Sequence, residues 1–312
     1  MIISLFVMVF SCKETPTVND RVAQVQIDFQ FSRFDNEFAD ASPDDLPALR
    51  EKYPYLFPAP DSVWVAKMGD TIQKELRSEV QKAFSEMDDV EADLELMFKH
   101  IKYYFPQKRL PKVITVTNSV NYADRVIWTD SLLFISLDNY LGPEHHFYAR
   151  TPRYVAKTMQ RRFIIPDVAQ TFAQQVVPRP KNRSFLAQMI YHGKILYVMD
   201  RLMPLQDDAE KLRYTEDELA WVRANEEPMW RYFVERDLLY STDHKLGPKF
   251  LEMAPFSKFG LELDNDSPGQ VGRYLGWQIV RGFMERNSLE MVQMLPLPAE
   301  EIFNKANYKP RR

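Results

Sequence analysis

The sequence predicts a helix-rich α+β fold in which helices pack on a small, mostly antiparallel sheet. Apolar residues recur at helical spacing in several segments, most clearly at 71–84 and 90–105. Two short runs rich in β-branched residues, VITVT at 113–117 and LLFISL at 132–137, predict strands. Because the strands come first and long helices follow, we expect helices packed on one sheet.

Length and composition are those of a globular protein. The chain has 312 residues, of which 45% are hydrophobic and 27% charged, so it can bury a substantial core as one large domain or two. The formal net charge is −4, which argues against electrostatic binding to a polyanion such as nucleic acid. We therefore expect no nucleic-acid partner.

The N-terminus is similar to a bacterial lipoprotein signal. Residues 1–11 contain the apolar run IISLFVMVFS, which is far shorter than the ~20 residues that a membrane-spanning helix needs. Cys12, the only cysteine, follows a small residue and precedes a polar, turn-forming stretch. Acylation of Cys12 would anchor the protein in a bilayer, with 12–21 as a tether. The alternative is a buried first strand with an incidental thiol.

The folded part is expected to begin at residue 22. In the segment 22–110, apolar and polar residues alternate from 25 to 31, which predicts a half-buried strand ahead of the two helices at 71–84 and 90–105. Residues 111–312 are expected to form the main domain, packed with 22–110 as one unit.

A helix is predicted at 165–177, where a proline and an aspartate in the first turn favour its start. Gln170, Thr171 and Gln174 then share one face of this helix. In HExxH zinc peptidases the same spacing carries two histidines and a glutamate. His192, on the next predicted helix and just before a glycine, holds the place of the third metal ligand.

These residue types do not suit peptidase chemistry. A glutamine carbonyl is a weak, neutral zinc ligand, so Gln170 and Gln174 add no charge to balance a divalent ion. The Thr171 hydroxyl is not ionised near neutral pH and cannot act as the general base. We therefore expect a zincin-like scaffold with a degenerate metal site, no cofactor and no catalytic residue. The alternative is that Gln170, Thr171, Gln174 and His192 never formed a site. Separately, the adjacent histidines His145 and His146 are expected to be surface loop residues.

A long helix is predicted over 215–239. Thr215 and Glu218 form a capping-box pattern at its start, and Pro228 is expected to bend or split it. The long irregular stretch that follows, 240–266, is of the kind that often carries function.

The last long helix is expected to start at Ser267. Gly272 and Gly276, four residues apart, would let another element approach its backbone closely. Tyr274 and Trp277 line a vestigial groove in one interpretation and are core residues in the other.

Four fragments resemble, in order, the gliding-motility lipoprotein GldB family of Bacteroidota. They are ISLDNYLG at 135–142, RFIIPDVAQ at 162–170, MIYHGKILY at 189–197 and SPGQVGRYLGWQIV at 267–280. With the lipoprotein-like start, the resemblance covers essentially the whole chain. The same fragments are similar, more distantly, to predicted HExxH zinc peptidases, which implies a zincin-like fold with an extra N-terminal helical segment.

The resemblance implies a component of, or accessory to, the gliding machinery and its type IX secretion system, without catalytic activity. We therefore expect a non-catalytic envelope lipoprotein, facing the periplasm rather than the cell surface. Its expected partners are envelope proteins of that machinery and the lipid bilayer, which acylated Cys12 would enter. Two alternatives remain open: a peptide- or glycan-binding lipoprotein that uses the former peptidase cleft, and a hydrolase with an unrecognised site.

Overall fold

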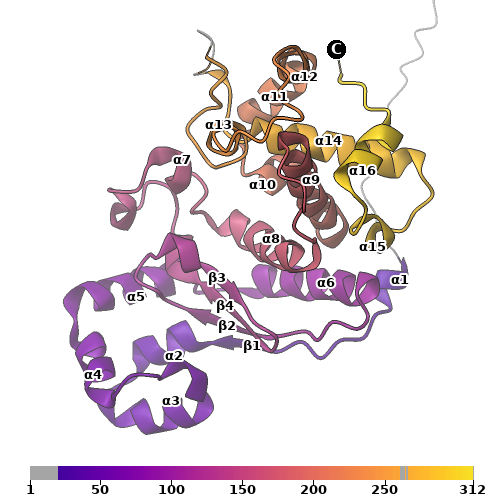
Figure 1. Cartoon of the computed structure of the whole chain (residues 1–312). Coiled ribbons are helices and arrows are strands. Elements are labelled where there is room, and N and C mark those ends of the chain that lie inside the picture. The colour runs from indigo at the N-terminus through magenta and orange to yellow at the C-terminus, as the bar shows by residue number, and fades with distance from the viewer. Residues whose placement is uncertain (1–19, 261–263, 265, 312) are drawn as a thin grey trace, which may run out of the picture.

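The computed structural model describes residues 20–260, 264 and 266–311. The predicted signal segment 1–11, Cys12 and most of the tether therefore lie outside the described residues. In the described part, a four-stranded sheet lies between short N-terminal helices and the longer helices of the C-terminal half (Figure 1). The fold is helix-rich α+β, as predicted.

The sheet is mixed rather than mostly antiparallel, which corrects the prediction. Its strands are β1 (Phe31–Arg33), β2 (Lys112–Val116), β3 (Val126–Trp128) and β4 (Leu132–Ser136), in the order β1-β2-β4-β3. β1 and β4 both pair with β2 in parallel, whereas β3 pairs with β4 antiparallel. The helical segment between β1 and β2 supplies the long crossover that a parallel pair needs. β3 lies at the edge, and the chain turns back from it into the middle of the sheet as β4.

The strand residues alternate between two cores on opposite faces of the sheet. Val113, Leu133 and Ile135 belong to the large core formed with the C-terminal helices. Ile114 and Phe134 pack in a small, aromatic-rich core formed with the N-terminal helices. Because successive strand side chains point to opposite faces and helices cover both, the strands are nearly continuous apolar runs in the sequence.

The N-terminal segment is helical for most of its length. Its helices are α1 (Asp20–Ala23), α2 (Phe34–Asp40), α3 (Leu46–Lys52), α4 (Asp61–Gly69), α5 (Thr71–Ala83) and α6 (Asp88–Tyr104). α5 and α6 confirm the helices predicted at 71–84 and 90–105. The strand predicted at 25–31 is wrong, since only Phe31 of that run belongs to β1. Ile27 and Phe29 nevertheless pack against the large core, which accounts for the alternating pattern.

The C-terminal half is built from α7 (Arg153–Ala156), α8 (Ile164–Val176), α9 (Phe185–Leu202), α10 (Asp208–Leu212), α11 (Glu216–Ala224), α12 (Glu226–Glu235), α13 (Leu246–Phe250), α14 (Val271–Arg286), α15 (Met291–Met294) and α16 (Ala299–Ala306). Short 3-10 helices occupy Pro43–Asp45, Pro54–Leu56, Tyr122–Asp124, Leu137–Asn139, His146–Tyr148 and Arg161–Phe163. α8 and α9 pack on α6 and on each other, and α14 packs along α9.

Two helix boundaries differ from the prediction. The capping box of Thr215 and Glu218 is confirmed, but the single helix over 215–239 is wrong, because the chain leaves helical geometry at Asn225 between α11 and α12. Pro228 lies in the first turn of α12, where its missing N–H costs no helical hydrogen bond. α14 begins four residues later than predicted, after Gln270, whose φ of 65° is left-handed.

The close approach predicted at Gly272 and Gly276 is confirmed. A Cβ on Gly276 would lie 1.9 Å from the Met189 carbonyl oxygen in α9, and one on Gly272 would lie 3.0 Å from the Phe250 carbonyl oxygen. Gly193 in α9 faces the same contact, since its Cβ would lie 2.2 Å from the Gly276 carbonyl oxygen. The backbones of α9 and α14 therefore touch.

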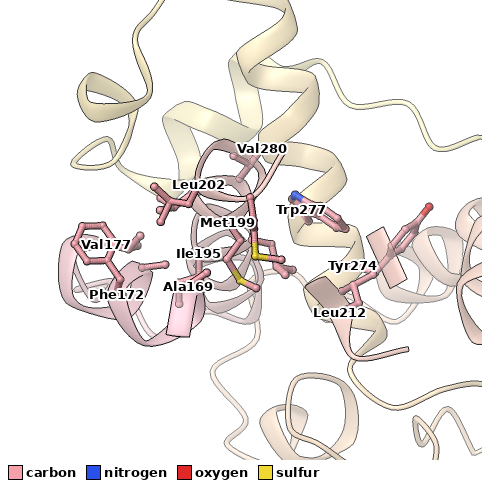
Figure 2. Close-up of a cluster of buried hydrophobic side chains, with 14 of the residues drawn as sticks. Ala169, Phe172, Val177, Ile195, Met199, Leu202, Leu212, Tyr274, Trp277 and Val280 are labelled. Atoms are coloured by element: carbon pink, nitrogen blue, oxygen red, sulfur yellow. The ribbon is translucent and has the colours of Figure 1, made fainter. Parts of the chain in front are cut away.

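Figure 2 shows the part of the large core where α8, α9 and α14 meet. Its labelled residues are each no more than 3% exposed: Ala169, Phe172, Val177, Ile195, Met199, Leu202, Leu212, Tyr274, Trp277 and Val280. This core sets the relative positions of α8, α9 and α14, and hence of the polar side chains that they carry.

His100 in α6 is a buried histidine without a hydrogen bond. It is 3% exposed, and neither ring nitrogen has a partner among the described residues. Burial, together with the positive charge of Arg201, lowers the pKa of His100 from 6.5 to about 4. The imidazole is therefore neutral at neutral pH, and its protonation is more costly in the folded chain than in the unfolded one.

We expect acid to destabilise the fold through His100. The unfolded chain takes up this proton first as the pH falls from 6.5 to 4, so the free energy of unfolding decreases in that window. Between pH 7 and pH 4.5 the wild type should lose about 2–3 kcal/mol more than a His100→Phe variant, measured by urea unfolding. The phenylalanine ring can keep the stacking on Tyr104, where the ring centroids are 6.4 Å apart.

The control for this experiment is His244→Gln. The His244 side chain is 90% exposed, so its removal should leave the acid sensitivity of the wild type unchanged. Equal losses in the wild type and in His100→Phe would contradict the role of His100.

Candidate functional site

Three of the four residues predicted for the degenerate metal site lie together. Gln170 and Gln174 from α8 and His192 from α9 line one hollow of about 10 Å³, which has room for roughly one water molecule. We call it the polar hollow. Thr171 does not line this hollow. Its hydroxyl donates a hydrogen bond of 2.8 Å to the Asp167 carbonyl oxygen, one turn earlier in α8.

The other polar walls of this hollow are largely cationic. Lys211 and Arg213 come from α10 and its C-terminal cap, and Gln270 and Arg273 come from the start of α14. Arg213 Nη1 donates to Gln170 Oε1 at 2.5 Å. A guanidinium group therefore holds the amide at the first predicted ligand position.

Next to the polar hollow, Asp167 is the centre of a buried ion-pair network. Its carboxylate accepts from Arg125 Nε at 2.5 Å and from Arg213 Nε at 2.9 Å. The Tyr140 hydroxyl donates to the same carboxylate at 2.8 Å. Burial alone would raise the pKa of Asp167, but the positive charges of Arg213 and Arg125 outweigh it and lower the pKa to about 2. Asp167 is thus ionised at neutral pH and serves as the counter-ion of two arginines.

This network joins segments that are far apart in the sequence, and sequence reasoning missed it. Asp167 was expected only to favour a helix start, and Arg125, Tyr140 and Arg213 were given no role. The two arginines lie 42 and 46 residues from Asp167. Periodicity and local motifs report neighbours within a few residues, so no signal in the sequence connected them.

The residues of the polar hollow fit a divalent metal ion poorly. Lys211, Arg213 and Arg273 bring three positive side chains to it, and its lining includes no carboxylate or thiolate. Burial and then the charge of Arg273 lower the pKa of His192 well below its ordinary value, so this imidazole is neutral. In the chain as described, no three His, Cys, Asp or Glu side chains are grouped so that they could hold a metal ion. Lys211 and Arg213 are already paired with Asp200 and Asp167, so within the described residues Arg273 is the lining cation that could meet an anion.

Tyr274 and Trp277 are core residues, the second of the two interpretations that their sequence left open. They are 1% and 0% exposed. The Tyr274 hydroxyl donates to Glu226 Oε2 at 2.7 Å, and Trp277 Nε1 donates to Asp200 Oδ2 at 2.9 Å. Each ring thereby buries its apolar body in the core of Figure 2 and still satisfies its polar atom.

A wider hollow of about 800 Å³ lies beside α7. Tyr154 and Lys157 line both this hollow and a second, small one. The second hollow in turn shares Arg213 and Gln270 with the polar hollow. Each hollow thus shares wall residues with the next, and together we call the three the α7 groove.

His145 and His146 line the wide end of the α7 groove. His146 Nε2 lies 3.0 Å from Glu75 Oε1, and His145 Nε2 lies 3.5 Å from Glu79 Oε2. The two imidazole rings stack, with their centroids 4.5 Å apart. Each histidine thus contacts a different carboxylate of α5, an arrangement that fastens the loop to α5.

Fold and site together define a helix-rich α+β protein in which a buried aspartate–arginine network lies beside a cationic hollow and a surface groove. Over residues 15–310 the chain matches the family model described as gliding motility protein GldB. The protein belongs to this family, as its fragments predicted, and is therefore associated with gliding motility and with the cell envelope. No curated protein and no solved structure gave a significant match, and the similarity to zinc peptidases stays a prediction. Within the described ranges, no helix combines the length and the apolar character needed to cross a bilayer.

Proposed function

We propose that this protein is a non-catalytic, lipid-anchored component of the gliding machinery that acts by binding another protein of the cell envelope. Membership of the GldB family supports the association with gliding. The position of Cys12 after a short apolar run supports acylation at this residue. The resemblance to the family's lipoproteins supports the periplasmic face, close to the type IX secretion system, as its place of action.

The contact between Arg213 and Gln170 carries the non-catalytic part of this proposal. In a zinc peptidase the matching helix position binds the metal ion that activates water. Here the Gln170 amide accepts from a guanidinium whose charge is balanced by Asp167. A divalent ion at this place would have to displace Arg213 and leave Asp167 short of a buried partner, at a cost of several kcal/mol.

The α7 groove supports the binding part. It is concave and combines charged and aromatic side chains, among them Arg153 and Tyr154 of α7. Lys157 is held in the wall by an ion pair of 2.5 Å with Glu218 at the start of α11. Preformed concave surfaces with a few oriented polar groups are typical of ligand sites.

The anchor is tested by labelling cells with radioactive palmitate. We expect the wild type to incorporate the label and to fractionate with membranes, and Cys12→Ser to lose both properties. The physical reason is that each buried methylene contributes about 0.8 kcal/mol, so two or three acyl chains hold firmly. A labelled, membrane-bound Cys12→Ser protein would contradict acylation at this cysteine.

The binding role is tested by photocrosslinking in intact cells. A photoreactive amino acid replaces the exposed Arg150, next to the α7 groove, and in a control strain the 52% exposed Val63 of α4. We expect one envelope protein to be cross-linked from position 150 and not from position 63. The same products from both positions, or none from position 150, would refute the binding role. Stoichiometric zinc that survives dialysis, with specific cleavage of a peptide library, would refute the non-catalytic role.

A further inference from the structure

We propose that the polar hollow binds a carboxylate group of a peptide that lies in the α7 groove. This inference rests on the proposed binding function and specifies the chemistry that the partner presents. Two polar side chains at the start of α14, Gln270 and Arg273, carry the argument, because both face the hollow and lack the partners that such groups normally have.

Gln270 is a largely buried residue whose polar end reaches the hollow. It is 6% exposed, and its side chain has no partner in the part of the chain that the structure describes. Its backbone is left-handed, with φ 65°, a conformation that is uncommon for glutamine. The side chain lies in the wall between the second hollow and the polar hollow. Its amide atoms are not among the fully buried unpartnered ones of the described residues, so they reach the hollow and are open to a hydrogen bond from a ligand there.

Arg273 adds an unpaired positive charge to the same wall. Its Nε donates to the Leu251 carbonyl oxygen, and within residues 20–260, 264 and 266–311 it makes no ion pair. The negative charge of Glu252 attracts the Arg273 guanidinium, but the two groups are too far apart to form an ion pair. Burial and then the charge of Arg213 lower the pKa of Arg273 to about 10, so the group is still a cation at neutral pH.

The surroundings leave this charge uncompensated. Asp167 already serves Arg125 and Arg213, so it cannot also balance Arg273. α14 is a helix of 16 residues, and its N-terminus, the positive end of the helix dipole, lies at Gln270. An anion in the polar hollow would therefore meet a guanidinium, a free amide and a helix N-terminus together.

The dimensions of the hollow favour a carboxylate over a larger anion. A volume of about 10 Å³ admits about one oxygen atom of a carboxylate next to the exposed Gln174, whereas a phosphate brings more oxygens. A planar carboxylate matches the two-pronged geometry of a guanidinium. Gln270 borders the hollow that comes next, and Tyr154 borders both that one and the wide hollow beside His145, so the rest of a peptide has neighbouring concave surfaces to contact.

Calorimetric titration of the purified full-length protein in detergent tests the proposal. The probes are acetyl-pentaalanine with a free C-terminus, the same peptide with an amidated C-terminus, amidated acetyl-Ala-Ala-Glu-Ala-Ala, and inorganic phosphate. We expect binding by the first or the third peptide, which tells a chain terminus from an acidic side chain as the source of the carboxylate. Equal binding of the amidated pentaalanine, or tighter binding of phosphate than of either acidic peptide, would overturn the proposal.

Two variants locate the bound carboxylate. Arg273→Gln removes the charge, and Gln270→Gly removes the amide while suiting the left-handed backbone, so the second variant keeps the fold intact. Each should weaken binding by about tenfold to a hundredfold, the range expected for a lost charged or buried hydrogen bond. Arg231→Gln, which removes a 55% exposed arginine of α12, should stay within twofold of the wild type. Unchanged affinity in Gln270→Gly and Arg273→Gln would overturn the site.

Failure of this inference is distinguishable from failure of the proposed function. If position 150 still cross-links to its envelope protein while no acidic peptide binds, the carboxylate site is wrong and the binding role stands. If acidic peptides bind but no envelope protein is cross-linked from position 150, the hollow is a carboxylate site and the proposed function is wrong.

Discussion

Alanine at Gly276 is expected to destabilise the protein by about 3 kcal/mol or more, or to prevent folding. The added Cβ would lie 1.9 Å from the Met189 carbonyl oxygen and 2.4 Å from the carbonyl carbon, both backbone atoms of α9. A helix backbone cannot rotate away as a flexible side chain does, so α9 and α14 would have to separate and loosen the packing around Trp277. Urea unfolding followed by far-ultraviolet circular dichroism measures the change in the free energy of unfolding.

Gly69→Ala is the matched control for this experiment. Gly69 is the last residue of α4, and nothing lies within 4 Å of the Cβ it would gain. This variant should be neutral or more stable than the wild type by up to about 1 kcal/mol, because alanine reduces the freedom of the unfolded chain. Gly193→Ala, on the other side of the contact, should behave like Gly276→Ala. A Gly276→Ala protein as stable as the wild type would refute the close packing of α9 and α14.

Replacing Asp167 with alanine is expected to cost about 3–5 kcal/mol of stability, because the buried guanidinium of Arg213 and the half-buried one of Arg125 lose their counter-ion. The side chains of Asp167 and Arg213 are only 2% and 4% exposed, so water cannot take over the lost contacts. Glu301→Gln, which breaks the exposed pair with Lys305 in α16, is the control and should cost less than about 0.5 kcal/mol. Equilibrium unfolding in urea at pH 7 gives both values. A loss from Asp167→Ala as small as that of the control would refute the network.

A double-mutant cycle separates charge from volume at this site. Asp167→Asn keeps the size of the side chain and removes its charge, and Arg125→Gln then removes one of the two uncompensated cations. The double variant should be at least about 1 kcal/mol more stable than the sum of the two single losses predicts. Additive losses would show that the charges are not coupled.

The acid response of Asp167 occupies a different pH window from that of His100. The folded-state pKa of Asp167 is about 2, below the ordinary 3.8, so its stabilisation is fully present above about pH 4 and is lost as the pH falls towards 2. The destabilisation by His100 is already complete at about pH 4. The two effects can therefore be told apart in one series of unfolding experiments.

Local patterns predicted the helices more accurately than the sheet. α5, α6 and α8 each lie within a few residues of their predicted positions, and α9 is the next helix, predicted to carry His192, because apolar spacing and first-turn residues are local properties. The direction of the strands was wrong, since β2 and β4 each look the same in sequence whether they pair in parallel or antiparallel. Pairing is decided by the helical crossover from β1 to β2 and by the turn from β3 into β4.

The candidate site was predicted in part. The spacing of Gln170 and Gln174, with His192 on the next helix, placed three residues that do share one hollow. The arginines that line that hollow were not anticipated, because a single sequence does not reveal which distant cations the fold will bring to Asp167. Tyr274 and Trp277 could have faced a groove or the core, and their helical position alone could not decide between the two.

The sequence by itself determined the helix-rich α+β class, the principal helices and the family. Periodicity, capping residues and the four family-like fragments are all properties of short stretches of chain. Only the tertiary structure decided that the sheet is mainly parallel, that Trp277 is a core residue and that Arg213 reaches Gln170. These features depend on which distant segments pack together. They also depend on charge, because the buried carboxylate of Asp167 needs positively charged partners, which distant segments supply.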